Sequence, residues 1–412
     1  MRHIYTSLDI GTDSIKVLVC ELYKNKLNLL AASSYKSEGI KKGLIIDGAK
    51  AASSIGKAIS DVEKMLNIKI NKVIVTIPSY SSEYQMIKTD VDVIDSNGNV
   101  TNEDIANIYR KIEKLELDNI LLNILPIDYC TEQSVYTKDA KTLVGKKLFN
   151  RSIIVTVPKK NIYSVSTLLE QMGIEIIDVS TNGIGDMYAL KTKENASKLG
   201  AIINIGSDTT SISIYNKGII VKNSIIGLGG KSIDNDLAYM YKISMGQAKK
   251  IKEKFALAHK KYASVNDLYD IILEDGKSLK VNQYEVSEIV MSRVEEILML
   301  AKKELVAMTD KKMEYILLTG GTSNMEHLEY VLDDIFGNNA SIGKINLIGV
   351  RNNKYSSALG NIIFYINKQN TKGIKNTMID EVDEINLSST KKDLVISTET
   401  MLGKVFEHFF GE

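Results

Sequence analysis

Two segments, LDIGTDSIKVLV (8–19) and INIGSDTTSISI (203–214), match each other without a gap although they lie about 195 residues apart. They share an isoleucine, a glycine and an aspartate at equivalent positions, and a hydroxyl residue follows each glycine. Such self-similarity indicates a duplicated domain. Each glycine turn lies between two runs rich in β-branched residues, so each segment predicts a β-hairpin. Dinucleotide fingerprints and P-loops open a helix after their glycines, so both of these motifs are excluded.

A third glycine turn lies in YILLTGGTSNMEHLEYVL (315–332). It predicts a buried strand, a two-glycine turn, and then a helix with Met325, Leu328, Val331 and Leu332 on one face. Tight turns that carry backbone N–H groups and hydroxyls can cradle phosphate. In this order, the two hairpins and the late strand–glycine–helix unit resemble the actin and heat-shock-chaperone superfamily. The segment GQAKKIKEKF (246–255) resembles the adenosine-contacting helix of that superfamily.

The resemblance implies an α/β protein with the actin-like (RNase H-like) two-lobed ATPase fold, which binds ATP and Mg²⁺ between its lobes. Asp9 would face Mg²⁺ through waters, because this ion gives up its water ligands reluctantly. The turns would bind phosphate, the later glycines would approach ribose and base, and the Lys-Glu pair would contact adenosine. The implied nucleotide-binding residues are Asp9, Gly11, Thr12, Ser14, Lys16, Asn204, Gly206, Thr209, Thr210, Gly229, Gly230, Lys252, Glu253, Gly320, Gly321 and Thr322.

Asn204 departs from the superfamily pattern, in which members that hydrolyse ATP well carry aspartate at this position. Asparagine keeps a hydrogen bond but supplies no charge and cannot act as a base. Asp9 and Asp186, the latter in NGIGDMYAL (182–190), are weak candidates for a catalytic carboxylate. The alternative for Asp186 is a residue at the start of a helix. The sequence therefore predicts ATP binding with weak hydrolysis or none.

Within the first lobe, SEGIKKGLIIDGAKAASSIGKAI (37–59) carries the pattern S-x-G-I-x-x-G-x-I-x-D. This segment, followed by VIVTIPSYSSEYQ (73–85), resembles FtsA, the actin-like bacterial cell division family. The likeness extends over nearly the whole chain. It implies the following division: first lobe, 1–81, 161–199 and 356–367; an extra subdomain inserted in it, 82–160; second lobe, 200–230 and 310–355; its small subdomain, 231–309; a linker, 368–396; and an amphipathic membrane-targeting helix, 397–412.

FtsA proteins bind the C-terminal peptide of FtsZ, the tubulin-like ring protein, on the small subdomain of the second lobe. The matching helix is EVSEIVMSRVEEILMLAKKEL (285–305), in which Arg293 resembles a family arginine at the peptide surface. The alternative is an ordinary surface arginine paired with Glu296, three residues further along the helix. The apolar face of this helix is expected in the core: Ile289, Val290, Val294, Ile297, Leu298 and Ala301.

The chain closes with MLGKVFEHFFGE (401–412), which holds three of its seven phenylalanines. Its large apolar residues recur at helical spacing and form one stripe. A helix this short is marginal alone in water, so its apolar face needs a partner. The membrane is favoured over docking on the chain's own domain, because the polar segment before it resembles a linker. The predicted membrane-binding residues are Leu402, Val405, Phe406, Phe409 and Phe410.

The composition sets limits on other functions. The chain carries 52 basic and 51 acidic residues, so no broad basic field is available for nucleic acid. Cys20 and Cys130 lack metal-ligand spacing and are expected to be reduced core thiols. The leading hypothesis is a self-associating division protein on the cytoplasmic face of the cell membrane, at the septum, with FtsZ, lipids and other division proteins as partners. The alternatives are a sugar or carboxylate kinase of the same superfold and a PilM-like pilus-assembly platform protein.

Overall fold

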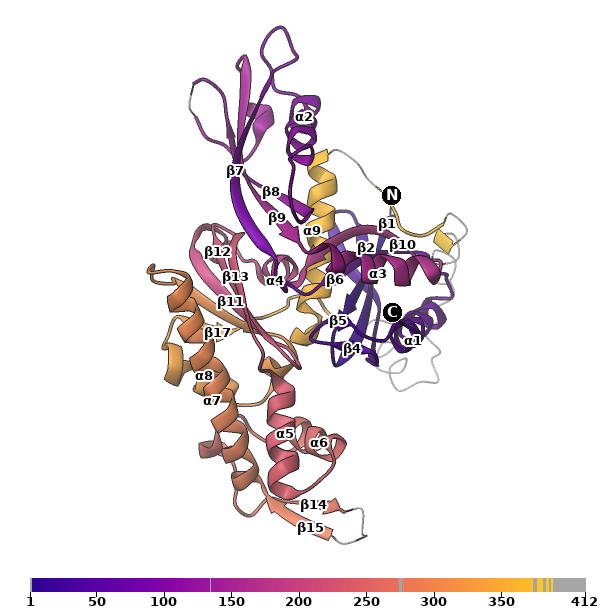
Figure 1. Cartoon of the computed structure of the whole chain (residues 1–412), viewed down its shortest axis with the longest axis vertical. Helices are drawn as coiled ribbons and strands as arrows, with labels where there is room; N and C mark the ends of the chain where they lie inside the picture. Colours follow the sequence, from indigo (N-terminus) through magenta and orange to yellow (C-terminus); the bar gives the residue numbers. More distant parts are fainter. Residues whose placement is uncertain are drawn as a thin grey trace, which may run out of the picture.

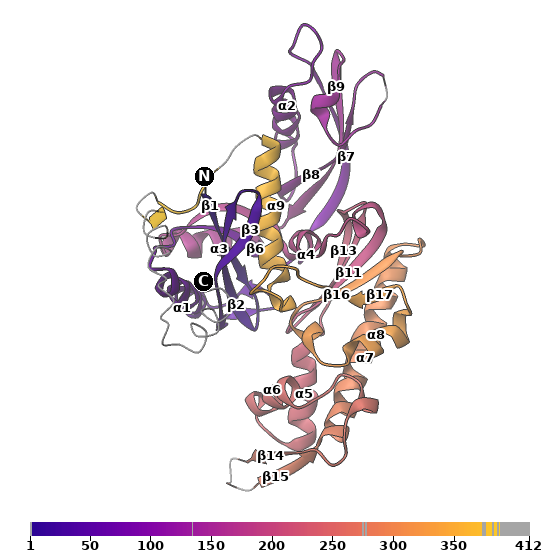
Figure 2. The ribbon, with the colours of Figure 1, turned by 180° about the vertical axis from the view of Figure 1, so that it is seen from behind.

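The computed structural model describes residues 2–133, 135–273, 276, 278–372, 376–380, 383, 384 and 387 of the 412. Two lobes lie side by side, each built on a five-stranded sheet, and a smaller subdomain projects from each lobe at opposite ends of an elongated molecule (Figure 1). The helices that cross between the lobes are best seen from behind (Figure 2).

The first sheet has the strand order β10-β6-β1-β2-β3. The hairpin β1–β2 pairs antiparallel and places Asp9 opposite Lys16. Helices cover both faces of the sheet, α1 and α3 on one face and α4 and α9 on the other. The bounds are β1 (Arg2–Ile10), β2 (Ser14–Tyr23), β3 (Lys26–Lys36), β4 (Ile40–Lys41), β5 (Leu44–Ile45), α1 (Gly48–Leu66), β6 (Lys72–Ile77), α3 (Lys159–Gln171), β10 (Glu175–Thr181), α4 (Asn182–Leu190) and α9 (Ser356–Lys372).

The second sheet has the order β13-β12-β11-β16-β17. Read from the meander edge, both sheets contain three antiparallel strands followed by two parallel ones. The predicted duplication and both hairpins are thereby confirmed. The bounds are β11 (Leu199–Ile205), β12 (Thr210–Asn216), β13 (Ile219–Ile226), β16 (Tyr315–Thr319), α8 (Leu328–Phe336) and β17 (Ala340–Ile342).

The inserted subdomain is a three-stranded sheet with one helix and a small core of its own. Its elements are β7 (Glu83–Asp92), α2 (Asn102–Glu113), β8 (Ile120–Cys130) and β9 (Lys147–Val157). Thr101 and Asp104 form a capping box that satisfies free N–H groups at the start of α2. The isoleucines at 105, 108 and 112 repeat every three to four residues and are all buried against the sheet.

The small subdomain of the second lobe contains three helices and a two-stranded sheet. Its elements are α5 (Gly230–Tyr241), α6 (Met245–Lys254), β14 (Leu268–Ile272), β15 (Ser278–Asn282) and α7 (Gln283–Met308). Most of the predicted apolar face of α7 is fully buried, and Ile289 packs at the edge of that core.

Helices α4 and α9 lie between the two sheets (Figures 1 and 2). They pack against each other at a pair of glycines, Gly185 and Gly360. A Cβ atom on Gly360 would overlap the carbonyl of Gly185, so only glycine permits this approach. A Cβ on Gly185 would in turn collide with the carbonyl of Ser357. The crossing brings the start of α9 close to the middle of α4, directly beneath the space between the lobes.

Several predicted boundaries differ from the structure. Met325 precedes α8, because a short 3₁₀ turn (Gly321–Asn324) follows the two glycines. The prediction that the linker starts at 368 is wrong. Helix α9 continues to Lys372, and Met378 and Ile379 are then buried against the first lobe. The amide of Met378 donates to the carbonyl of Ile4 at 2.8 Å. The helix expected at 397–412 lies outside the described residues.

Two further observations concern the thiols and the membrane. Cys20 and Cys130 are both free and buried, as expected of core thiols. Burial raises the pKa of the Cys20 thiol to about 12. In the part of the chain that the structure describes, no helix combines the length and the apolar character needed to span a bilayer.

Candidate functional site

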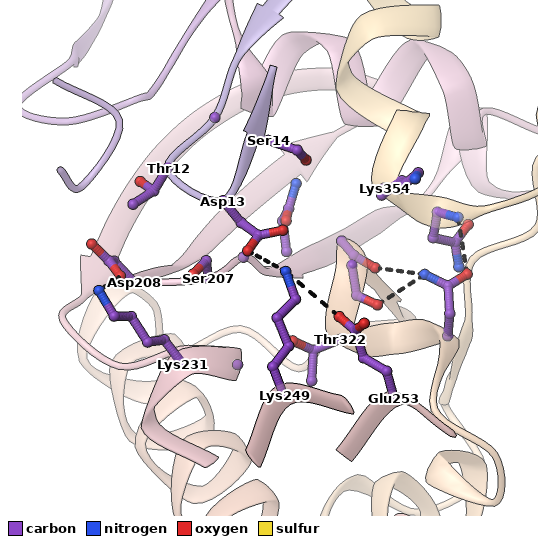
Figure 3. Close-up of a pocket in the computed structure, with 18 of the residues that line it drawn as sticks. Thr12, Asp13, Ser14, Ser207, Asp208, Lys231, Lys249, Glu253, Thr322 and Lys354 are labelled. Carbon is purple, nitrogen blue, oxygen red and sulfur yellow. Dashed lines mark hydrogen bonds and ion pairs between the residues drawn. The ribbon is translucent and has the colours of Figure 1, made fainter. Parts of the chain in front are cut away.

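A cleft of about 780 Å³ lies between the two lobes, where the turns of both hairpins face helix α6 and the turn after β16 (Figure 3). Its wall also includes the 3₁₀ turn η5 (Asn353–Tyr355) that leads into α9. Most of the predicted nucleotide-binding residues line it: Asp9, Gly11, Thr12, Ser14, Lys16, Asn204, Gly206, Thr209, Gly230, Lys252, Glu253, Gly320, Gly321 and Thr322. The predicted residues that do not line it are Thr210 and Gly229.

The first turn places one acidic and one basic side chain together at the floor of the cleft. The Lys16 ammonium lies 2.9 Å from an Asp9 carboxylate oxygen, because β1 and β2 pair these residues directly. A Cβ on Gly11 would lie 2.8 Å from the Lys16 nitrogen, so glycine leaves room for this lysine. The hydroxyl of Thr12 accepts a hydrogen bond from the amide of Gly43 at 2.8 Å and keeps its own proton for donation.

The second turn is fastened to the start of α5. The amides of Gly230 and Lys231 donate to the carbonyls of Gly206 and Ser207 at 2.8 and 2.9 Å. A Cβ on Gly229 would overlap the Ser207 carbonyl, so this glycine serves the packing of the turn and does not face the cleft.

The prediction that Thr210 binds phosphate is wrong. Its side chain is fully buried, and its hydroxyl donates to the carbonyl of Leu228 at 2.9 Å. Successive side chains of a strand point to opposite faces. Thr209 therefore faces the cleft, while Thr210, the first residue of β12, turns inward.

Glycines also bring the backbone of the second lobe close to the cleft. Gly320 has a φ of +93°, a conformation that disfavours any side chain. A Cβ on Gly320 would overlap the Oδ1 atom of Asn204. A Cβ on Gly230 would lie 2.6 Å from the Thr322 hydroxyl. Gly230 and Gly320 therefore leave open space in the cleft wall, which a larger residue at either position would partly fill.

The two residues of the predicted Lys-Glu pair on α6, Lys252 and Glu253, lie in different environments. Lys252 is buried, and its ammonium donates to the carbonyl of Gly230 at 2.9 Å and pairs with Asp234 at 2.8 Å. Burial raises the pKa of Asp234, although Lys252 opposes this effect. Glu253 is exposed and lies 3.8 Å from Lys249. Lys252 therefore supports the wall of the cleft, while Glu253 lies at its mouth.

Side chains that the sequence prediction did not include connect the lobes across the mouth (Figure 3). Asp13, in the first turn, pairs with Lys249 of α6 at 2.5 Å. Its counterpart in the repeat, Asp208, accepts from the amide of Lys42 at 3.3 Å and lies 3.7 Å from Lys231. The repeat itself held the signal for both aspartates, because they occupy equivalent positions in the two segments.

Lys354 is another missed residue of the cleft wall. Burial and the nearby charge of Lys16 lower the pKa of its ammonium group, which lies 5.0 Å from the ring of Tyr355. Lysines thus line the cleft on every side: Lys16, Lys36, Lys42, Lys231, Lys249, Lys252, Lys254 and Lys354.

Asp186 lies behind the cleft wall and not in it. The side chain is buried in the middle of α4, so the alternative of a helix-start residue is wrong. Its carboxylate accepts from the Asn204 amide and from the hydroxyls of Ser356 and Ser357, each at 2.7 Å. Burial raises the pKa of Asp186 to about 6, and the charge of Asp9 adds to this effect. Asn204 separates this carboxylate from the cleft.

Arg293 lies on the small subdomain, outside the cleft. Its guanidinium group makes two hydrogen bonds to Asp236 of α5, at 2.6 and 2.9 Å, and also pairs with Glu296. The pair with Glu296, which the alternative interpretation of Arg293 expected, is present, whereas Asp236 was missed because it belongs to another helix. These carboxylates raise the pKa of Arg293 further above its ordinary value.

Comparison with known proteins gives the relationship of the chain. The family model described as "Cell division protein FtsA" matches residues 201–360. The cell division protein FtsA of Bacillus subtilis is 27% identical over 379 residues, which cover 91% of this chain and 86% of that protein. The resemblance to FtsA is confirmed.

Solved structures agree on the fold of this chain. A PilM-PilN type IV pilus biogenesis complex matches with a TM-score of 0.58 at 14% identity, covering 86% of this chain and 96% of that one. MreB5 of Spiroplasma citri, bound to AMPPNP, matches with a TM-score of 0.55 at 15% identity, covering 90% and 99%. The predicted actin-like fold is thereby confirmed.

The residues of the cleft fit a nucleotide. A glycine-lined cradle with many lysines suits a polyphosphate, because backbone N–H groups and ammonium groups both attract anions. For a metal ion, the described residues contain no group of three or more His, Cys, Asp or Glu side chains placed to hold it. Asp9 and the Asn204 oxygen could therefore bind Mg²⁺ only in part, with waters and phosphate oxygens as its other ligands.

Proposed function

We propose that this chain is an ATP-binding, actin-like cell division protein that links FtsZ polymers to the cytoplasmic membrane at the septum. The observation that carries the proposal is the glycine-lined, lysine-rich cleft between two duplicated lobes in a relative of FtsA. The AMPPNP in the MreB5 structure supports ATP as the ligand, since that protein shares the fold.

The proposed roles within the cleft follow from charge. Thr12, Gly206 and Thr209 would donate hydrogen bonds to phosphate oxygens. Lys16, now paired with Asp9, would turn toward the phosphates when Mg²⁺ binds near that carboxylate. The ion would neutralise phosphate charge, and the chain's own part is to hold the nucleotide between its two turns. Glu253 would contact the ribose from the mouth.

Hydrolysis is proposed to be weak. The amide of Asn204 cannot accept a proton from an attacking water. Asp186 could, but it lies behind Asn204 with its oxygens already engaged by three donors. Bound ATP would then act as a long-lived conformational signal that favours self-association into filaments. The subdomains at the two ends of the molecule are the proposed contacts between neighbouring copies (Figure 1).

The proposed membrane anchor is the apolar stripe Leu402, Val405, Phe406, Phe409 and Phe410. Leu387 packs against the core of the first lobe, and the Lys69 amide donates to Asp383 at 3.1 Å. The nine residues 388–396 separate this point from the predicted helix. Nine residues span at most about 30 Å, so the first lobe would lie close to the bilayer. The positive charge of Lys404 is offset by the negative charges of Glu407 and Glu412, so attraction to anionic lipid would be weak. The phenylalanines would therefore provide most of the attachment to the membrane.

FtsZ binding is proposed at Arg293. The pairing with Asp236 holds this guanidinium group between α5 and α7, with about a quarter of its side chain exposed. A peptide that reaches it would use donors not engaged by Asp236, since an arginine offers five.

The test is co-sedimentation with vesicles containing anionic lipid, with and without ATP, in the presence of an FtsZ C-terminal peptide. We expect full-length protein to sediment with the vesicles and to bring the peptide with it. Deletion of residues 401–412 should abolish vesicle binding, while raising the salt concentration should barely change it. R293A should lose the peptide but keep the vesicles. Strong salt sensitivity, or binding that survives the deletion, would contradict the proposed anchor.

The kinase and PilM-like alternatives are not favoured. A kinase needs a free carboxylate in the cleft to act as a base, whereas position 204 is asparagine and Asp186 is shielded from the cleft. Asp9 does line the cleft, but its carboxylate is paired with Lys16. The likeness to PilM is one of fold, at 14% identity. A coupled kinase assay with sugar and carboxylate acceptors would exclude the first alternative if no phosphate is transferred.

A further inference from the structure

Asp186 and Asn204 form a pair that joins helix α4 to the wall of the cleft. The Asp186 side chain is 1% exposed, and its Oδ2 atom accepts from the Asn204 amide nitrogen at 2.7 Å. Its Oδ1 atom accepts from the hydroxyls of Ser356 and Ser357. Among the described residues, these hydrogen-bond partners are hydroxyls and an amide, and none of them is a cation. A buried carboxylate without a paired cation is unusual and requires a reason.

The surroundings of Asp186 offset part of the cost of burying its charge. Ser356 and Ser357 begin α9, and the start of a helix carries partial positive charge. The glycine crossing makes this contact possible, because any side chain at Gly185 would push the Ser357 backbone away. The fold thus brings the positive end of one helix to a carboxylate in the middle of another.

The ionised carboxylate determines which way the Asn204 amide points. A carboxylate can only accept hydrogen bonds, so the amide nitrogen must face it. The oxygen of Asn204 is then directed away from Asp186 and lies against Gly320, on the wall of the cleft. Asn204 therefore presents an acceptor to the cleft while a negative charge lies one hydrogen bond behind it.

We propose that Asp186 is a positioning residue for the Mg²⁺–nucleotide complex, which orients Asn204 and supplies the negative charge that position 204 lacks. The inference rests on the proposed function, because it assumes that ATP binds with Mg²⁺. Two carboxylates at hydrogen-bond distance cannot both ionise easily. The aspartate expected at 204 from the superfamily pattern is therefore incompatible with an ionised Asp186.

The contact between Asp186 and Asn204 predicts a result opposite to the superfamily rule. N204D restores the usual residue but places two carboxylates together, so it should weaken Mg²⁺–ATP binding by about tenfold. D186N should leave ATP affinity in EDTA unchanged and reduce the gain that Mg²⁺ brings, also by about tenfold. The double variant N204D/D186N rebuilds the pair with its partners exchanged and should recover Mg²⁺–ATP affinity to within about threefold of the wild type.

The experiment measures ATP affinity of full-length protein by titration calorimetry, with Mg²⁺ and with EDTA, together with thermal unfolding of the nucleotide-free protein. D104N is the matched control, because Asp104 is also a buried carboxylate that accepts several hydrogen bonds, but in the inserted subdomain. It should lower stability without changing the dependence on Mg²⁺. If N204D alone does not fold, a double variant that folds and binds Mg²⁺–ATP still supports the pair.

Three outcomes would overturn the inference alone: tighter Mg²⁺–ATP binding by N204D, additive losses in the double variant, or a double variant that does not fold. Wild-type protein that binds no ATP would overturn the proposed function as well. The two failures are therefore distinguished by the wild-type titration.

Discussion

Replacing Lys249 by methionine should accelerate the release of bound nucleotide. Lys249 on α6 pairs with Asp13 in the first turn, and this contact joins the two lobes at the mouth of the cleft (Figure 3). A nucleotide held between the turns must pass this contact when the lobes separate. Methionine keeps the length of the side chain and removes its charge, so the variant tests the ion pair and not the packing.

The size of the effect follows from the exposure of the pair. Burial disfavours the charge of Lys249, but the hydrogen bond and charge of Asp13 outweigh it and raise the lysine pKa, so the ionised pair is favoured. Both partners remain partly exposed, 37% for Lys249 and 47% for Asp13, so water and salt screen the attraction. Pairs of this kind contribute about 0.2–1 kcal/mol. If the pair is broken before release, the rate should rise about 1.5- to 5-fold.

The assay is stopped-flow displacement of a fluorescent ATP analogue by excess ATP. K249M and D13N should each accelerate release, and the double variant should be no faster than either alone. K250M is the control, because Lys250 is exposed on the same helix and forms no ion pair among the described residues. Slower release by D13N would refute the reasoning, since it would mean that Lys249 binds the phosphates directly and that Asp13 competes for it. Equal acceleration by K250M would refute it too.

Three further predictions concern stability and thiol chemistry. G360A should destabilise the protein by about 1–3 kcal/mol or more, since the new methyl group meets the Gly185 carbonyl. An unchanged urea denaturation curve would contradict the close contact between α4 and α9 at these glycines. The Asp186 pKa is raised from 3.8 to about 6 on folding, so its stabilising contribution is full below pH 3.8 and is lost as pH rises through 6. In the wild type, this effect should lower the free energy of unfolding by about 3 kcal/mol at most as the pH rises through this window. The D186N variant should lack this decrease, and denaturation curves at pH 4.5 and 6.5 would detect the difference. Cys20 and Cys130 should not react with a thiol reagent in native protein and should both react in urea; rapid native labelling would contradict their burial.

Local patterns carried most of the architecture. The paired segments at 8–19 and 203–214 predicted both hairpins, because β-branched runs around a glycine turn favour strand–turn–strand locally. The apolar spacing of 285–305 predicted the buried face of α7 for a similar reason. These features depend on residues close together in the sequence, so the sequence alone is sufficient to reveal them.

The candidate site was predicted less completely. Thr210 was assigned to phosphate because it follows Thr209, but the pleat of β12 turns it inward. Lys252 was predicted to contact adenosine and does line the cleft, but the pattern did not reveal that Asp234 of a neighbouring helix holds its ammonium group. In each case the decisive contact comes from an element whose position in space the local pattern does not contain.

The amino-acid sequence by itself indicated the duplication and the two hairpin turns, since local patterns specify both, and its resemblance to the actin superfamily implied the two-lobed fold with a cleft between the lobes. Only the tertiary structure decided which charges meet: Asp13 with Lys249, Arg293 with Asp236, and Asp186 with Asn204 and the serines of α9. The physical reason is that electrostatic and hydrogen-bond partners are selected by distance in space. Packing features such as the crossing at Gly185 and Gly360 set those distances between residues that are remote in the chain.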